Sequence, residues 1–224
     1  MRTLLCCGMS LMSALAFSAE PLRVGVVVFD GFLSSEVVAP MEVFAKATSE
    51  GAAQPFEVMT IGASGKPVRS HEGLVIEPAA TLANSPPLDI LVVPSAMDME
   101  RVLADQALVA FIKARGAQAR YVASHCAGAF LLGKAGLLEG RRATTYIGGA
   151  ESLQKAYPRA RVQGDEQVVV DGRLVTSIGG AASYEGSLAL LEAISGPKVA
   201  DRVADALYYF RWKEKKATAA AGAR

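Results

Sequence analysis

Cys126 is the residue of this chain with the clearest chemical potential. An apolar, strand-like stretch ends at this cysteine, and small residues and a helix-like apolar pattern follow it, in the run YVASHCAGAFLL. A strand-to-helix turn of this kind places a side chain at the carboxyl edge of a sheet and at a helix N-terminus, where backbone N–H groups favour thiolate over thiol. We therefore expect Cys126 to be a nucleophile whose pKa lies below the value of about 8.5 of an ordinary thiol.

The alternative is that Cys126 is a buried, inert cysteine, which is a common state for this residue. A function is favoured because Cys126 stands at the expected strand-to-helix turn. The other cysteines, Cys6 and Cys7, lie in a segment that we expect to be removed. The mature chain would then have no possible internal disulfide. A lone thiol in an oxidising compartment is a liability unless it serves a purpose.

The segment 1–19 resembles a secretory signal peptide. Arg2 supplies a short positive region, the stretch from Thr3 to Phe17 is apolar, and small residues up to Ala19 suit a cleavage site. The segment is too short for a comfortable membrane span, and an uncleaved anchor is the alternative. We expect a periplasmic or secreted protein without a stable membrane span after cleavage.

Composition indicates one globular domain and excludes several classes of partner. The chain has 224 residues, of which 51% are hydrophobic and 20% charged, with a formal net charge of +1. This length allows a substantial core. Lys and Arg form no long block, so charge gives no support to nucleic-acid binding. His71, His125 and Cys126 lack metal-ligand spacing, and no phosphate-cradling glycine loop is present, so we expect no metal and no cofactor.

Strand and helix signals alternate along the chain. This pattern predicts a single α/β domain over residues 22–212, a three-layer sandwich with a mostly parallel sheet, followed by a flexible tail over 213–224. The expected strands cover 22–29, 56–61, 88–93 and the stretch before Cys126, with a hairpin over 167–176, and the expected helices cover 34–48, 99–114, 181–195 and 197–212.

Three segments should meet beyond the carboxyl ends of these strands, where ligands of such sheets bind. They are the start of the first helix with Glu36, the turn that contains Ser95 and Ala96, and the turn at Cys126. The residues alone give Glu36 only the role of an acid that favours the helix dipole.

Four motifs resemble, in order, the ThiJ/PfpI superfamily. The resemblance runs from about Val24 to Val203 and is closest to the isonitrile hydratase branch and to the sensor domains of AraC-type regulators. It implies the flavodoxin-like fold of class I glutamine amidotransferases and a homodimer. The motifs are Glu36–Pro40 (EVVAP), Cys126–Gly128 (CAG), Gly140–Thr145 (GRRATT) and Val170–Ser177 (VDGRLVTS).

The resemblance pairs Cys126 with Glu36, which matches an acidic residue that contacts the cysteine sulfur in this superfamily. A carboxyl beside a thiolate should have a raised pKa, because two like charges at close range are costly. Protonated Glu36 would donate a hydrogen bond to the thiolate and pass a proton to a substrate. The backbone N–H groups of Ala127 and Ala96 are candidate oxyanion donors.

The chain also departs from the family pattern. Ser95 and Ala96 stand where many members have two glycines, and Tyr146 stands where many carry a histidine. His125 precedes the cysteine, and strand alternation points its imidazole away from the thiol, so a Cys-His-acid protease triad is poorly supported. The further pocket candidates are Ser95, His125, Tyr146, Gly179 and Gly180.

Three functions fit these residues. The first is an enzyme of the hydro-lyase (hydratase) type, in which Cys126 attacks an electrophilic carbon of an isonitrile-like or reactive-carbonyl compound and Glu36 moves the proton. The second is a redox sensor or oxidative-stress protein, in which Cys126 is oxidised to a sulfinate held by Glu36. The third is a module that binds a small molecule without turnover.

The signal-peptide pattern leads to the first prediction. We expect the mature chain to begin near Ala19 or Glu20 in a Gram-negative host, because the apolar stretch ends there in small residues. N-terminal sequencing of the protein from periplasmic extract measures this directly. Soluble protein from the cytoplasm that retains Met1 would contradict it.

Overall fold

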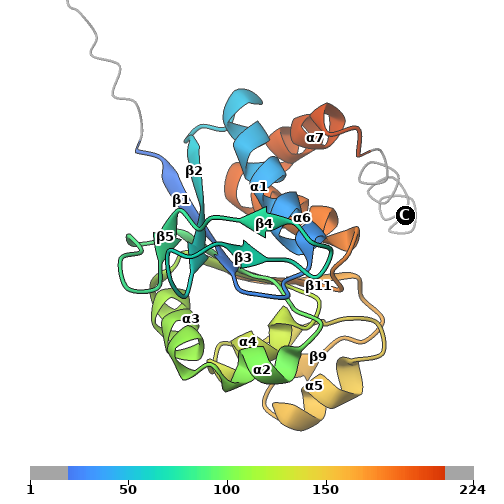
Figure 1. The fold of residues 1–224 in the computed structure, drawn as a ribbon. Helices are drawn as coiled ribbons and strands as arrows, with labels where there is room; N and C mark the ends of the chain where they lie inside the picture. Colours follow the sequence, from blue (N-terminus) through green and yellow to red (C-terminus); the bar gives the residue numbers. More distant parts are fainter. Residues whose placement is uncertain (1–19, 210–224) are drawn as a thin grey trace, which may run out of the picture.

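The computed structural model describes residues 20–209 and places a seven-stranded sheet at the centre of the molecule (Figure 1). All neighbouring strands are parallel except the hairpin at one edge, so the predicted α/β fold with a mostly parallel sheet is confirmed. The predicted signal peptide, residues 210–212 and the predicted tail lie outside the described residues. The strands, in sheet order, are β10 (Val168–Asp171), β11 (Leu174–Ser177), β7 (Tyr121–His125), β6 (Ile90–Val93), β1 (Leu22–Val28), β2 (Phe56–Gly62) and β5 (Ala80–Thr81).

Helices cover both faces of the sheet and make the expected three layers (Figure 1). One face carries α1 (Ser34–Ser49), α6 (Ala182–Ser195) and α7 (Pro197–Ala206), and the other carries α2 (Met99–Ala104), α3 (Gln106–Gln118), α4 (Gly128–Lys134) and α5 (Ala150–Ala156). Two small pairs complete the fold: the antiparallel β3 (Val68–Arg69) and β4 (Val75–Ile76), and the parallel β8 (Arg142–Ala143) and β9 (Arg161–Val162). Within residues 20–209, no helix is both long enough and apolar enough to cross a membrane.

The central strands are apolar along their length because helices bury both of their faces. All four residues of β6 are buried, and β1 is buried except at Arg23. The predicted hairpin is also confirmed: β10 pairs with β11, and Gly172 lies in the turn with φ of 62°. A residue with positive φ is what a tight hairpin turn requires, and glycine supplies it without strain.

One predicted helix is wrong, because the stretch 99–114 forms two helices that meet at Asp105. The backbone of Asp105 is extended, with φ of −72° and ψ of 97°, and its side chain accepts a hydrogen bond from the backbone N–H of Leu108. Asp98 caps α2 in the same way through the N–H of Arg101. Side chains of this type compete with helical backbone bonds, so local capping overrides the apolar periodicity of the stretch.

The chain changes direction across the sheet at β1. From β1 it continues through α1 to β2 on one side, and it later returns to place β6 on the other side. The crevice at the carboxyl ends of β1 and β6 is therefore the topological switch point, where ligands of this class of sheet bind. Glu36 follows β1, Ser95 follows β6, and Cys126 follows β7, the next strand along.

Gly128 lets the start of α4 approach the end of β6 closely. A Cβ atom on Gly128 would lie 2.4 Å from the carbonyl oxygen of Val93 and 2.9 Å from that of Pro94. Both contacts are with backbone, which gives way less easily than the end of a flexible side chain. The glycine thus sets how near the Cys126 turn can come to the Ser95 turn.

We expect Gly128→Ala to destabilise the protein by about 1–3 kcal/mol, because overpacking displaces α4 from β6. Urea denaturation measures the loss. Gly65→Ala is the matched control, since an added Cβ there meets no atom within 4 Å and the backbone is not left-handed. Equal stability of the two variants would show that α4 does not depend on this close approach.

Candidate active site

Cys126 lies in a tight turn between β7 and α4, with φ of 51°. A positive φ is uncommon for a residue other than glycine, so the surrounding structure must hold it. The backbone N–H of Cys126 donates to the carbonyl oxygen of Ser177 at 2.8 Å, and its carbonyl oxygen accepts from Thr145 Oγ1 at 3.0 Å. The thiol itself is half-buried.

Glu36 lies in the first turn of α1 and is fully buried. Its Oε2 accepts a hydrogen bond of 2.6 Å from the backbone N–H of Ser95. Its Oε1 has no hydrogen-bond partner of ordinary geometry within the described residues. The structure therefore buries a carboxyl that is satisfied on one side only.

Gly179 packs directly against both Glu36 and Cys126. A Cβ atom on Gly179 would lie 2.4 Å from Cys126 Cβ and 2.6 Å from Glu36 Oε1. Its φ of 83° also favours glycine. The structure thus brings together Glu36, Ser95, Cys126 and Gly179, which come from four separate segments of the chain.

Burial raises the pKa of Glu36 above its ordinary value. The N–H and hydroxyl of Ser95, the Cys126 thiol and the N–H of Gly180 act in the opposite direction and offset part of this rise. Gly180 thus contributes its backbone, and no side chain, to the site. A carboxyl in this environment retains its proton to higher pH than one in water.

Burial, and then the charge of Glu36, also raise the pKa of the Cys126 thiol, while the Ser95 hydroxyl and the N–H of Ala127 favour the thiolate. The expectation of a lowered thiol pKa is therefore wrong in direction. It relied on the N-terminus of α4, which has only seven residues. Withdrawal from water and a neighbouring carboxylate outweigh that contribution.

The two acids titrate as a coupled pair. The charge of Glu36 raises the pKa of the Cys126 thiol, and the hydrogen bond from that thiol offsets part of the burial that raises the pKa of Glu36. The pair therefore releases its first proton well before its second. Between these two steps it holds one proton and one negative charge, and the proton is shared between Glu36 and Cys126.

The candidate oxyanion donors differ in what they contact. The N–H of Ala127 acts on the Cys126 sulfur. The N–H of Ala96 instead donates to Met99 Sδ at 3.2 Å, and Ala96 bridges to Phe32. The expected role of Ala96 is thus not available in this arrangement, because its amide already has a partner.

His125 contacts Ser177, and no hydrogen bond joins its ring to the thiol within the described residues. Its Nδ1 lies 2.8 Å from Ser177 Oγ, and its ring is buried. Burial lowers the pKa of His125 to about 4, so the ring is neutral at neutral pH. The contact with Ser177 makes His125 part of the support of the turn.

Thr145 and Ser177 hold the Cys126 turn from its two ends, and sequence reasoning gave them no role at the site. Both lie in segments that marked the family resemblance, Gly140–Thr145 and Val170–Ser177. Their hydroxyl and carbonyl contacts connect segments far apart in the chain. No spacing within the sequence indicates such contacts.

A groove of about 520 Å³ lies beside the Cys126 turn, and Tyr146 is one of its walls. The ring of Tyr146 stacks on Phe130, with 6.3 Å between the ring centroids. Tyr146 thus lines a cavity that it shares with Ala127, the neighbour of Cys126, while Cys126, Glu36 and Ser95 are not part of that lining. The groove is lined by Met99, Glu100, Leu103, Ala104, Ala127, Phe130, Lys134 and Tyr146.

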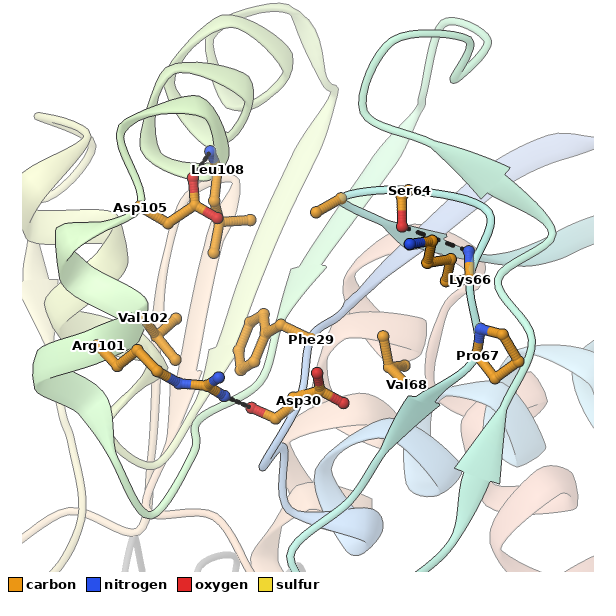
Figure 2. Close-up of a pocket in the computed structure, with 11 residues that line it drawn as sticks. Phe29, Asp30, Ser64, Lys66, Pro67, Val68, Arg101, Val102, Asp105 and Leu108 are labelled. Atoms are coloured by element: carbon orange, nitrogen blue, oxygen red, sulfur yellow. Dashed lines mark hydrogen bonds between the residues drawn. The ribbon is translucent and has the colours of Figure 1, made fainter.

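A second cavity, of about 320 Å³, lies on the other flank of α2, and its lining includes none of Cys126, Glu36 and Ser95. Figure 2 shows Arg101 reaching across its floor to the carbonyl oxygen of Asp30, beside the ring of Phe29. In the described part of the chain, no three His, Cys, Asp or Glu side chains gather in a way that would hold a metal ion.

Comparison with known sequences shows which proteins this chain resembles. The model of the DJ-1/PfpI family matches residues 22–193. The isonitrile hydratase of Pseudomonas putida is 31% identical over 188 residues, which cover 84% of this chain and 78% of that protein. The HTH-type transcriptional regulator GbdR of Pseudomonas aeruginosa is 24% identical over 88% of this chain, which spans about half (53%) of that regulator.

Solved structures agree with the fold. A THiJ/PfpI family protein from Pseudomonas syringae superposes with a TM-score of 0.76 and 27% identity, over 84% of this chain and 75% of that one. DJ-1beta of Drosophila melanogaster superposes with a TM-score of 0.72 over 84% of this chain and 98% of that one, at 23% identity. The similarity to DJ-1beta, at this level of identity, concerns the fold alone.

The coupled pair leads to a prediction about thiol reactivity. The alkylation rate of Cys126 by iodoacetamide should show two inflections with pH, because the thiolate fraction rises once when the pair loses its first proton and again when it loses the second. Glu36→Gln should leave a single inflection, at lower pH than the upper one of the unsubstituted protein, because the opposing charge is gone.

Glu42→Gln is the matched control, since Glu42 lies on the exposed side of the same helix and contacts Tyr184. Its profile should be that of the unsubstituted protein. A single inflection at the same pH in all three proteins would mean that Glu36 and Cys126 do not sense each other's charge.

Proposed function

The chain belongs to the DJ-1/PfpI family, and from that premise we propose that it is a cysteine-dependent enzyme that hydrates isonitrile-like compounds. Reactive carbonyl compounds are the second substrate class considered. The observation that carries the proposal is the buried Glu36 carboxyl beside the half-buried Cys126 thiol. Such a pair supplies a nucleophile and a proton at the same place.

The proposed reaction begins from the singly charged pair, with the proton on Glu36 and the charge on sulfur. The thiolate attacks the terminal carbon of the isonitrile, and this carbon takes the proton of Glu36, so that a C–S and a C–H bond form. Water then adds to the same carbon. Glu36 carries one water proton to the nitrogen and accepts the other, the C–S bond breaks, and an N-substituted formamide leaves.

Three contacts support this assignment of roles. The N–H of Ala127 and the hydroxyl of Ser95 favour negative charge on the sulfur, which is the form that attacks. The N–H of Ser95 holds one carboxyl oxygen of Glu36 at 2.6 Å, so the other oxygen stays on the side of the thiol. A positioned acid of this kind contributes about a hundredfold or more to the rate.

The relatives support the chemistry as well. One is named isonitrile hydratase, and the alignment covers most of both chains. The regulators among the relatives favour the third function, a module that binds a small molecule without turnover. The raised thiol pKa lowers the thiolate fraction on which oxidation and nucleophilic attack both depend, so it does not separate the redox sensor from the enzyme.

We also propose that the protein is exported and that it assembles as a homodimer. The N-terminal pattern supports the first statement and the family resemblance supports the second. Measuring the native mass of the protein in solution tests whether it is a homodimer.

We expect Cys126→Ser to abolish isonitrile hydration, because a serine hydroxyl ionises far less readily than a thiol and no histidine base activates it: His125 contacts Ser177. Glu36→Gln should lower the rate by about a hundredfold, since the amide donates a hydrogen bond but carries no proton to the substrate. Formamide production from a simple alkyl isonitrile measures both effects.

Glu42→Gln, on the exposed side of α1, should retain full activity and controls for effects on the helix. Saturable binding without product would favour the binding module. A gain of two oxygen atoms on Cys126 after mild peroxide, without turnover, would favour the redox sensor.

A further inference from the structure

The N-terminal end of α1 is capped by a residue from a different part of the chain. The N-cap position is occupied by Leu33, whose side chain makes no capping hydrogen bond, and leucine is among the residues that suit this position least. Glu72, in the turn between β3 and β4, supplies the cap instead. Its Oε2 accepts hydrogen bonds from the backbone N–H of Ser34 at 3.0 Å and from the Ser34 hydroxyl at 2.6 Å.

We propose that Glu72 is a positioning residue of the candidate active site: its carboxylate fixes the first turn of α1 and thereby the place of Glu36 beside Cys126. The inference deepens the proposed function, because it rests on the pair formed by Glu36 and Cys126. It gives a role at the site to the β3–β4 hairpin, which contributes no group to the pair itself.

The β3–β4 hairpin is attached to the loop that leads into α1. The two strands form a two-stranded sheet of their own. The backbone N–H of Gly31 donates to the carbonyl oxygen of Arg69 at 2.8 Å, and the N–H of His71 donates to the carbonyl oxygen of Phe32 at 2.8 Å. These backbone bonds lie on both sides of the loop and hold the turn with Glu72 against the start of the helix.

The contact between Glu72 and Ser34 is present over the whole range in which a thiol titrates. Burial acts to raise the pKa of Glu72, but the hydroxyl and N–H of Ser34 outweigh it and hold this pKa at about 2. The buried hydroxyl of Ser70 lies 2.7 Å from Ser34 Oγ and supports the same arrangement. Because the pKa is lowered by folding, the cap is at full strength above the ordinary value of 4.5 and is lost only as the pH falls toward 2.

The first turn of α1 connects Ser34 to Glu36. The N–H of Glu36 donates to the carbonyl oxygen of Leu33 at 3.1 Å, and the N–H of Leu33 donates to the carbonyl oxygen of Ser95 at 3.1 Å. The N–H of Ser95 in turn donates to Glu36 Oε2 at 2.6 Å. The turn is thus held by Glu72 on one side and by Ser95 on the other, and a displacement of the turn would move the carboxyl relative to the thiol.

The influence of Glu72 on the pair passes through geometry. Burial, Ser95, Cys126 and Gly180 set the pKa of Glu36, whereas Glu72 acts on Ser34. Loss of Glu72 should therefore change the titration of Cys126 only by letting the carboxyl of Glu36 move. This dependence on Glu36 distinguishes a positioning role from a general effect on the stability of the turn at Cys126.

The test follows the alkylation of Cys126 by iodoacetamide against pH in Glu72→Ala. We expect the upper inflection to move by about half a pH unit toward the single, lower inflection of Glu36→Gln, because a displaced carboxylate opposes ionisation of the thiol less strongly. The double variant, Glu36→Gln with Glu72→Ala, should keep the profile of Glu36→Gln. In Glu72→Gln an uncharged oxygen still accepts from Ser34, so the shift should be smaller and in the same direction.

Glu77→Ala is the matched control, since Glu77 is an exposed acid that directly follows β4. Its profile should be that of the unsubstituted protein. An unchanged profile in Glu72→Ala would overturn the inference. So would an equal shift with and without the Glu36 carboxyl, because a general loosening of the site produces that result. Circular dichroism establishes that Glu72→Ala is folded, and if it is not, the same comparisons are decided with Glu72→Gln.

Alkylation requires no turnover, so the two proposals can fail separately. A protein that hydrates no isonitrile but shows the shift that depends on Glu36 would contradict the proposed function and support the positioning role of Glu72. A protein that hydrates isonitriles and shows no shift in Glu72→Ala would overturn the positioning role and leave the proposed function standing.

Discussion

The site depends on one constraint, a carboxyl that is buried next to a thiol. Glu36 is fully buried, and its hydrogen bond of 2.6 Å comes from an uncharged backbone amide of Ser95. The groups that act on its pKa include no cation. A carboxylate in such a place is costly, so the environment favours the protonated acid. Burial therefore raises the pKa of the carboxyl that stands beside the Cys126 sulfur.

The rest of the site serves to keep these two groups close. The carbonyl oxygen of Ser95 accepts a hydrogen bond of 3.1 Å from the backbone N–H of Leu33. This bond connects the start of α1 to the segment that follows β6. Gly128 and Gly179 remove the side chains that would separate the backbones. Because these contacts are mostly between backbone groups, the pair depends on the register of strands and helices at the switch point.

The sequence was sufficient to predict a mostly parallel sheet and the meeting of the Glu36, Ser95 and Cys126 segments at its edge, because the alternation of strand and helix signals along the chain is a local pattern. It did not predict the sign of the thiol pKa shift, because burial arises only when distant segments pack together. The amide of Ala96 was assigned to the substrate for the same reason: its contact with Met99 depends on where α2 lies. The helix break was different, since Asp105 is a local capping signal that apolar periodicity concealed.

That break has consequences for what the protein can bind. Because α2 ends at Asp105, it is a short helix that turns Met99 and Leu103 toward the groove beside the thiol and Val102 toward the cavity of Figure 2. The chemistry of the pair is thus fixed by the core, while the shape of the groove is fixed by α2 and the loop at Tyr146. Because neither Glu36 nor Cys126 lines that groove, substitutions on its wall can alter its shape and leave the pair in place.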